Sequence, residues 1–121
     1  MTKSRQALGK WGETLAADFL NDEGYIIIER NYRTPYGEID LVAQDGDILV
    51  FVEVKTRTSD AFGFPEESIT SQKREHLISA SQAILQSMSN PPINWRIDVI
   101  AIRKVKSADY PEIIHFKNAI N

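Results

Sequence analysis

The sequence predicts an α/β domain with a mixed central sheet of about five strands flanked by helices. Apolar periods and runs occur in the order helix, three strands, helix, two strands. Three consecutive strands joined by short turns favour an antiparallel meander, and the helix after them can cross over to make the fourth strand parallel. A chain of 121 residues suits one domain with its own buried core, so we expect residues 1–121 to form a single domain.

The first helix is expected from about Leu8 and ends at Gly24, after a polar segment, 1–7, that we expect to be mobile. Apolar residues recur on one side of this helix: Leu8, Trp11, Leu15, Ala16, Phe19 and Leu20. Glu13 lies at the border of this stripe, where it either faces solvent or reaches the neighbouring strands. The first strand is expected over 25–33, and Thr34-Pro35-Tyr36-Gly37 has the composition of a turn.

The segment 37–57 contains the strongest turn signal, Asp45-Gly46, between two apolar runs. With these two residues as the turn, facing positions sum to 91, which places Glu38 opposite Glu53. Side chains alternate along a strand, so one face of this hairpin collects four charged residues. They are Glu38, Asp40, Glu53 and Lys55.

A divalent cation explains this arrangement better than a solvated surface does. Like charges facing each other destabilise a sheet, whereas Asp40 and Glu53 could bridge a metal that prefers oxygen ligands. Lys55, roughly 7 Å along the strand from Glu53, could neutralise a phosphate or position a water. The alternative is an exposed hairpin face with a Glu–Lys pair. It does not explain why the strand 48–54 is otherwise apolar on both faces.

The next segment, Thr58 to Glu67, is expected to be a loop whose Phe62 and Phe64 anchor it to the core or contact a substrate. A second helix, capped by Thr70 or Ser71, runs to about Met88. Its first turn carries Gln72, Lys73 and Arg74, where a substrate phosphate would be favourable, although a solvated basic turn is the commoner case.

The fourth strand is expected from Trp95 to Lys104. Asp98 lies within its apolar run and needs a partner if it is buried, for which Arg96 is the candidate on the same face. The last strand is expected from Ile113 to Phe116, and we interpret its His115 as a satisfied edge histidine rather than a ligand.

Composition narrows the chemistry. The chain has no cysteine and two histidines, which excludes a disulfide framework and favours oxygen ligands with Mg²⁺ or Mn²⁺. A net charge of −3 argues against a protein that coats nucleic acid non-specifically. No long apolar run could span a membrane, and the first residues lack the apolar core of a signal peptide. A cytoplasmic location is therefore expected.

Asp40, followed thirteen residues later by Glu53-Val54-Lys55, resembles the split signature of the PD-(D/E)xK nuclease superfamily, with Ile39 in place of the proline. A longer series of motifs resembles the YraN-like family, small bacterial proteins usually described as predicted endonucleases distantly related to Holliday junction resolvases. These motifs are Gly12-Glu13, Gly24-Tyr25, Arg30-Asn31-Tyr32-Arg33, Gly37-Glu38-Ile39-Asp40-Leu41, the segment 52–57, Arg96-Ile97-Asp98-Val99, Ile114-His115-Phe116 and Asn118-Ala119.

The resemblance implies a restriction-endonuclease-like core and metal-dependent hydrolysis of DNA phosphodiester bonds, including branched or junction DNA in repair or recombination. It implies that Mg²⁺ or Mn²⁺ is bound by Asp40, Glu53 and Glu13, and that Lys55 is catalytic alongside Asp40 and Glu53. The side chains expected to contact DNA are Arg33, Arg57, Gln72 and Lys73.

Two further expectations concern assembly and activity. A homodimer is expected, because resolvase-like enzymes cut two strands symmetrically and this chain carries one site. The competing hypothesis is a catalytically silent nucleic-acid- or protein-binding module that retains the nuclease fold.

Overall fold

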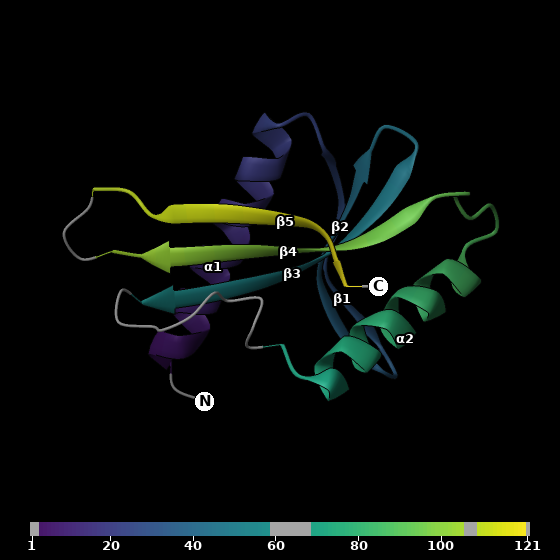
Figure 1. The fold of residues 1–121 in the computed structure, drawn as a ribbon, viewed down its shortest axis with the longest axis horizontal. Coiled ribbons are helices and arrows are strands. Elements are labelled where there is room, and N and C mark those ends of the chain that lie inside the picture. The colour runs from purple at the N-terminus through teal and green to yellow at the C-terminus, as the bar shows by residue number, and fades with distance from the viewer. Residues whose placement is uncertain (1–2, 59–68, 106–108, 121) are drawn as a thin grey trace.

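The computed structural model of the chain describes residues 3–58, 69–105 and 109–120. Over these residues it is an α/β structure with a five-stranded mixed sheet and a helix on each face, as the sequence predicts (Figure 1). The elements in chain order are α1 (Lys3–Asp22), β1 (Ile26–Thr34), β2 (Gly37–Asp45), β3 (Ile48–Thr58), α2 (Ser71–Ser87), β4 (Trp95–Lys104) and β5 (Glu112–Ile120). Among the described residues, neither helix has the length and apolar character needed to cross a membrane.

Two elements are longer than the apolar pattern predicts. The helix α1 begins at Lys3 rather than near Leu8, because the preceding residues are good helix formers although they carry no apolar stripe. The strand β5 continues to Ile120, past a bulge at Asn118, whose φ is +51°. The expected loop with Phe62 and Phe64 lies outside the described residues, apart from Thr58.

The strands lie side by side in sequence order, β1-β2-β3-β4-β5. Every neighbouring pair is antiparallel except β3 and β4, which are parallel because α2 carries the chain back between them. Thr70 caps α2 as expected, since its hydroxyl accepts a hydrogen bond from the Lys73 backbone N–H at 3.1 Å.

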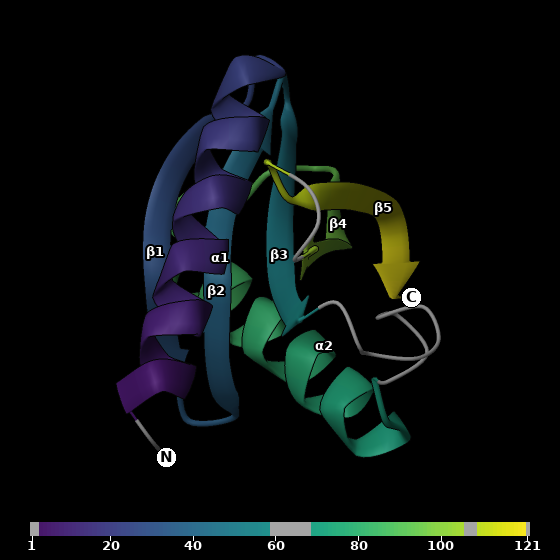
Figure 2. The same ribbon diagram turned by 90° about the vertical axis from the view of Figure 1, so that its left-hand side faces the viewer.

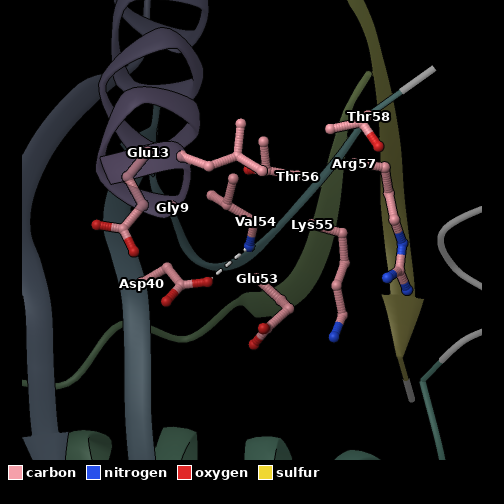
Figure 3. Close-up of a pocket in the computed structure, with 10 residues that line it drawn as sticks. Gly9, Glu13, Asp40, Glu53, Val54, Lys55, Thr56, Arg57 and Thr58 are labelled. Carbon is pink, nitrogen blue, oxygen red and sulfur yellow. Dashed lines mark hydrogen bonds between the residues drawn. The ribbon is translucent and has the colours of Figure 1, made fainter. Parts of the chain in front are cut away.

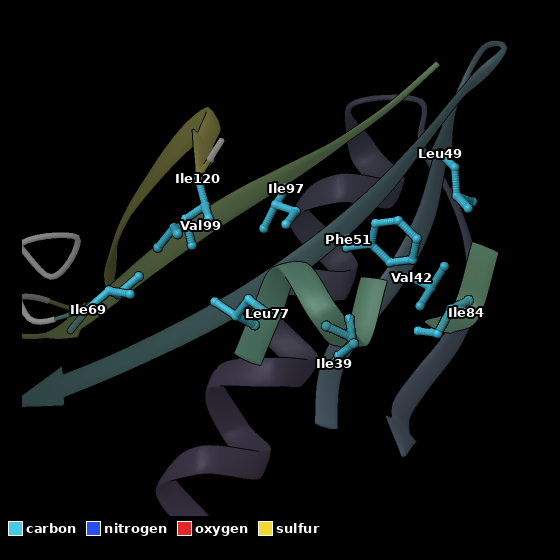
Figure 4. Packing of buried hydrophobic residues seen from close by; sticks show 11 residues of the cluster. Ile39, Val42, Leu49, Phe51, Ile69, Leu77, Ile84, Ile97, Val99 and Ile120 are labelled. Carbon is cyan, nitrogen blue, oxygen red and sulfur yellow. The ribbon is translucent and has the colours of Figure 1, made fainter. Parts of the chain in front are cut away.

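The two helices cover opposite faces of the sheet, so the central strands are buried on both sides. Figure 2 shows α1 lying along the β1–β2–β3 side, while α2 packs on the other face. The core under α1 consists of Ala16, Ala17, Leu20, Tyr25, Leu41, Ala43, Val50, Val52, Ile100 and Ile102. The core under α2, drawn in Figure 4, consists of Ile39, Val42, Leu49, Phe51, Ile69, Leu77, Ala80, Ile84, Ile97, Val99 and Ile120.

The register predicted for the β2–β3 hairpin is wrong by one residue at the turn. Asp45 pairs with Ile48, so the turn residues are Gly46 and Asp47, and facing positions sum to 93 rather than 91. Gly46 has a φ of +61°, and Asp47 is not among the residues with positive φ. A glycine at the first turn position fits a type II′ turn, whereas the prediction assumed the type I′ turn favoured by Asp-Gly.

A fully buried acid lies on β4. Asp98, with 0% of its surface exposed, accepts hydrogen bonds from Arg96 Nε at 3.0 Å and from the Asn118 backbone N–H at 2.8 Å. His115 Nε2 lies 2.7 Å from the other carboxylate oxygen. The predicted Arg96–Asp98 pair is therefore confirmed, and His115 is satisfied by Asp98. Arg96 also donates to the hydroxyl of Tyr25 at 2.8 Å, which links β4 to the start of β1.

Candidate metal centre

The candidate site forms where β2 and β3 separate. Their pairing runs from the turn to Leu41 opposite Val52 and stops there. Ile39 packs under α2 whereas Leu41 packs under α1, so the regular alternation of β2 breaks at Asp40. The Val54 backbone N–H then donates to Asp40 Oδ2 at 2.7 Å, so a side-chain carboxylate takes the place of a strand carbonyl (Figure 3).

The corrected register brings together the two acids that the sequence proposed as metal ligands. With facing positions summing to 93, Asp40 comes level with Glu53, and Glu38 does not. Glu38 instead lies near Arg33, with 3.7 Å between Arg33 Nε and Glu38 Oε2. The expectation that Glu38 faces Glu53 is therefore wrong, because the turn is one residue further along the chain.

Glu53 is buried with an unused acceptor. Only 6% of its surface is exposed, and its Oε2 atom accepts no hydrogen bond from the residues that the structure describes. Lys73 Nζ, from the first turn of α2, lies 3.5 Å from that oxygen. An ion pair of this length neutralises part of the charge and leaves the oxygen able to accept a shorter, stronger ligand.

The electrostatics of the pair favour a cation. Burial, with a further contribution from the nearby Glu53 carboxylate, raises the pKa of Asp40 to about 8, against the opposing effects of the Val54 N–H and Lys73. Burial also raises the pKa of Glu53, against the opposing charges of Lys73 and Lys55. A buried and a half-buried carboxyl group that resist ionisation side by side are the arrangement that a divalent ion would stabilise.

Glu13 approaches the same region from α1 but is held by other partners. With its amide nitrogen turned toward them, Asn31 donates to Glu13 Oε1 at 3.1 Å and to Glu38 Oε1 at 2.8 Å. Burial raises the pKa of Glu13, although the hydrogen bond from Asn31 opposes this. Asn31 has a φ of +53° and lies in the part of β1 that faces Asp40, because β1–β2 pairs sum to 71 there.

The close approach of α1 to β3 depends on Gly12. A Cβ atom at this position would overlap Thr56 Oγ1 and lie 3.0 Å from Thr56 Cβ. Rotation of the threonine cannot clear the second contact, so a side chain at position 12 would push the helix away from the strand. The bare backbone of Gly12 therefore allows the next residue, Glu13, to lie beside the cleft.

These residues line an open cleft of about 810 Å³. Its lining includes Glu13 from α1, Asp40 from β2, and Glu53, Lys55 and Arg57 from β3 (Figure 3). Thus one cleft collects all three predicted metal ligands, the predicted catalytic lysine and one of the predicted DNA contacts.

The donor set fits a magnesium-type ion with few protein ligands. In the described parts of the chain, no three His, Cys, Asp or Glu side chains are grouped closely enough to hold an ion by themselves. Magnesium is commonly bound through one or two carboxylates, with water and substrate phosphate completing its shell. Asp40 and the unused oxygen of Glu53 meet that requirement, and Glu13 lies at the edge of the cleft rather than within a closed ligand cage.

The predicted catalytic lysine and the predicted DNA-contacting side chains lie in different places. Lys55 is half-buried and forms no salt bridge with any described residue, so it is not the pairing partner of Glu53 or Glu38. Gln72 is exposed on the first turn of α2, next to Lys73. Arg33, on β1, has 88% of its side chain exposed beside Glu38 and does not line the cleft.

The sequence profile of the Uncharacterised protein family UPF0102 matches residues 12–102. This chain belongs to the UPF0102 family. A UPF0102 protein of Syntrophotalea carbinolica is 40% identical over 121 residues, covering 100% of this chain and 97% of the relative. UPF0102 proteins of Roseiflexus castenholzii and Thermodesulfovibrio yellowstonii are 47% and 45% identical, each over at least 96% of both chains.

Two features of this UPF0102 site are absent from the sequence prediction. The ion pair of Lys73 with Glu53 joins residues from different elements, and Asn31 joins Glu13 to Glu38. The sequence carries a signal for Asn31, since asparagine tolerates positive φ better than most residues and stands within a strand, between Arg30 and Tyr32. It carries none for the Lys73 contact, which depends on how α2 returns across the sheet.

Proposed function

We propose that this protein is a metal-dependent endonuclease that hydrolyses DNA phosphodiester bonds. The observation that carries the proposal is the meeting of Asp40 and Glu53 where β2 and β3 separate, with Glu53 Oε2 buried and without a hydrogen bond from the described residues. The resemblance to the PD-(D/E)xK superfamily assigns the same two positions to metal ligands. A structural role would leave these two neighbouring carboxylates with only the partial balancing charge of Lys73.

Asp40 and Glu53 are the residues that would hold Mg²⁺ or Mn²⁺, and Glu13 is the third acid available beside them. A bound divalent ion would supply Lewis acidity at the phosphate and a lowered pKa for a coordinated water. The Val54 N–H fixes the orientation of Asp40, so this carboxylate is positioned before any ligand arrives.

Lys55 would supply positive charge, or a proton, at the scissile phosphate. It lines the cleft, follows Glu53 on the same face of β3 and has no ion pair among the described residues. A lysine with these properties is free to interact with an anionic substrate.

DNA contacts would come from Arg57 in the cleft and from Gln72 and Lys73 on α2. Arg33 would contact a more distant part of the DNA strand or a second arm of a branched DNA substrate. Branched or junction DNA in repair or recombination is the substrate class that the resemblance suggests. We also propose a homodimer, which sedimentation at high micromolar concentration with DNA present would test.

A specific observation favours the second candidate, a binding module without catalysis. Lys73 already lies 3.5 Å from Glu53, so an internal ammonium group partly neutralises the acid without a metal. A protein that had lost catalysis could keep this ion pair and the fold.

Cleavage assays on labelled branched and linear DNA, with Mg²⁺ and with EDTA, test the proposal. Wild type should cut only with the metal. Lys55→Ala should reduce the rate by about 100-fold or more while metal affinity is retained, because a positioned acid–base or electrostatic group is lost. Glu53→Gln should lose metal affinity and cleavage together.

Lys117→Ala is the matched control, because it removes the same charge from an exposed position on β5. It should cut like wild type. Metal binding without cleavage of any substrate would support the silent module, and a Lys55→Ala protein as fast as wild type would reject the catalytic role of Lys55.

A further inference from the structure

Lys73 lies against Glu53, the buried acid of the candidate metal centre. Its side chain is 38% exposed, whereas that of Glu53 is 7% exposed, so the ammonium group is partly in solvent and the carboxylate is not. The separation of 3.5 Å is longer than a good charge-assisted hydrogen bond. Glu53 Oε2 accordingly accepts no hydrogen bond from the described residues.

The place of Lys73 in its helix makes this contact easy to exchange. Its backbone N–H is fixed by the Thr70 cap at the start of α2, which anchors the main chain and leaves the side chain to rotate. A cation in the first helical turn opposes the helix dipole, and α2 has no acid in that turn to offset it. Glu53 is therefore the only acid shown to hold this ammonium group in the described structure.

A divalent ion at this site would compete with Lys73 for Glu53 Oε2. An ion bound by Glu53 would lie close to the ammonium group, and the repulsion between the two cations would oppose metal binding. A DNA phosphate at the mouth of the cleft would give Lys73 an alternative partner of the same charge as Glu53. The start of a helix is also a favourable place for that phosphate.

We propose that Lys73 is an exchangeable counter-ion: it neutralises Glu53 in the DNA-free protein and transfers to a substrate phosphate, which opens Glu53 to the divalent ion. This inference rests on the proposed metal centre. It makes the binding of metal and DNA mutually dependent, so that each increases the affinity of the protein for the other. The ion would then be held strongly only when a substrate strand is present.

Titration of Mn²⁺, followed by the electron paramagnetic resonance signal of the free ion, tests this directly. Each protein is titrated alone and with a saturating phosphorothioate-substituted oligonucleotide, whose intactness is checked on a gel afterwards. In wild type, the oligonucleotide should tighten Mn²⁺ binding by about tenfold or more, since a nearby cation is removed from the site. Lys73→Met alone should bind Mn²⁺ about as tightly as wild type does with the oligonucleotide, and should gain much less from adding it.

Two variants control for charge and for the identity of the cation. Lys117→Met removes a positive charge from an exposed position on β5 that does not line the cleft, and should keep the wild-type affinities and the oligonucleotide effect. Lys73→Arg keeps a cation at position 73 and should keep the coupling. Thermal unfolding of each variant confirms that it is folded at the titration temperature.

The outcomes separate this inference from the function on which it rests. Equal Mn²⁺ affinity in wild type and Lys73→Met, or the same oligonucleotide effect in both, would overturn the exchange while leaving the metal centre intact. Absence of Mn²⁺ binding in every protein and condition would reject the metal centre itself. The titration needs no cleavage, so a silent binding module could still show the coupling.

Discussion

The sheet holds two groups of acids that are shielded from solvent: Asp98 alone, and the pair Asp40 and Glu53. The two groups differ in whether the protein supplies hydrogen-bond donors for their oxygens. Asp98 accepts hydrogen bonds from Arg96 and the Asn118 N–H and contacts His115. Asp40 accepts one from the Val54 N–H, and Glu53 keeps an oxygen with no hydrogen bond in the described structure. The first group is complete within the chain, and the second is not.

The pKa values of these acids move in opposite directions because the acids differ in how many hydrogen-bond donors they have. Burial would raise the pKa of Asp98, but the hydrogen bonds from His115, the Asn118 N–H and Arg96 outweigh it and lower the pKa. Burial raises the pKa of Asp40, and Glu53 adds to the effect. A buried acid with enough donors stabilises a fold, whereas a buried pair short of donors is available to a ligand.

Removing Asp98 should produce the largest loss of stability. Asp98→Ala leaves His115 and the Asn118 N–H without their acceptor and leaves Arg96 with Asp45 as its remaining ion pair, which should lower the free energy of unfolding by about 3–5 kcal/mol. Urea denaturation measures the loss. Asp18→Ala, at an exposed position of α1, should change stability by less than about 0.5 kcal/mol. Equal effects of the two substitutions would remove the structural role assigned to Asp98.

The hydrogen bonds of Asp98 also predict how stability depends on pH. This pH-dependent contribution is included in the loss of stability expected for Asp98→Ala. The pKa of Asp98 is lower in the folded protein than its ordinary value of 3.8. The stabilisation is therefore present above that value and is lost as the pH falls below it, through the folded pKa. Denaturation between pH 5 and 2 should show a steeper loss for wild type than for Asp98→Ala. Parallel curves would contradict the prediction.

The cleft that holds Asp40 and Glu53 is bounded by α1, so the packing of α1 against β3 should affect stability. Gly12→Ala should lower the free energy of unfolding by about 1–3 kcal/mol through overlap with Thr56, despite the better helix propensity of alanine. Gly9→Ala is the matched control: a Cβ there meets nothing within 4 Å, so stability should rise by up to about 1 kcal/mol. The double variant Gly12→Ala/Thr56→Ala should recover part of the loss, because it removes the overlapping Oγ1 and keeps the Cβ that would lie at 3.0 Å. Failure to recover would mean that the overlap is not the cause.

Sequence patterns predicted those parts of the molecule that depend on local rules. The bounds of β4 and the Thr70 cap of α2 follow from apolar alternation and cap chemistry, and both are confirmed. The Arg96–Asp98 pair was predictable because residues two apart on a strand share a face. The crossover by α2 followed from the length of the connection, which makes β3 and β4 parallel.

The remaining features depend on small steric choices or on distant contacts. The turn at Gly46-Asp47 differs by one residue from the predicted turn, and that step moved Glu38 away from Glu53. The contacts of Asp98 with His115 and the Asn118 N–H required a bulge in β5 that no local pattern marks. The predicted identity of the site residues did not depend on the register, because a change of two in the pair sum keeps Asp40 and Glu53 on one face.

The smallest expected effect, and the one with the opposite sign, comes from Asp40→Asn. An asparagine oxygen can still accept the Val54 N–H, while the substitution removes a buried charge that Glu53 repels. The metal-free variant should therefore be more stable than wild type at pH 8, by about 1 kcal/mol, as is common when a strained functional group is replaced. Asp47→Asn, which changes an exposed acid in the hairpin turn, should leave stability nearly unchanged.

Adding Mn²⁺ should then raise the thermal midpoint of wild type and of Asp47→Asn, but not of Asp40→Asn, because only the folded, ligand-competent site gains binding energy. If Asp40→Asn instead destabilises the metal-free protein as Asp98→Ala does, Asp40 is a structural acid like Asp98, and the difference between the two groups of acids disappears.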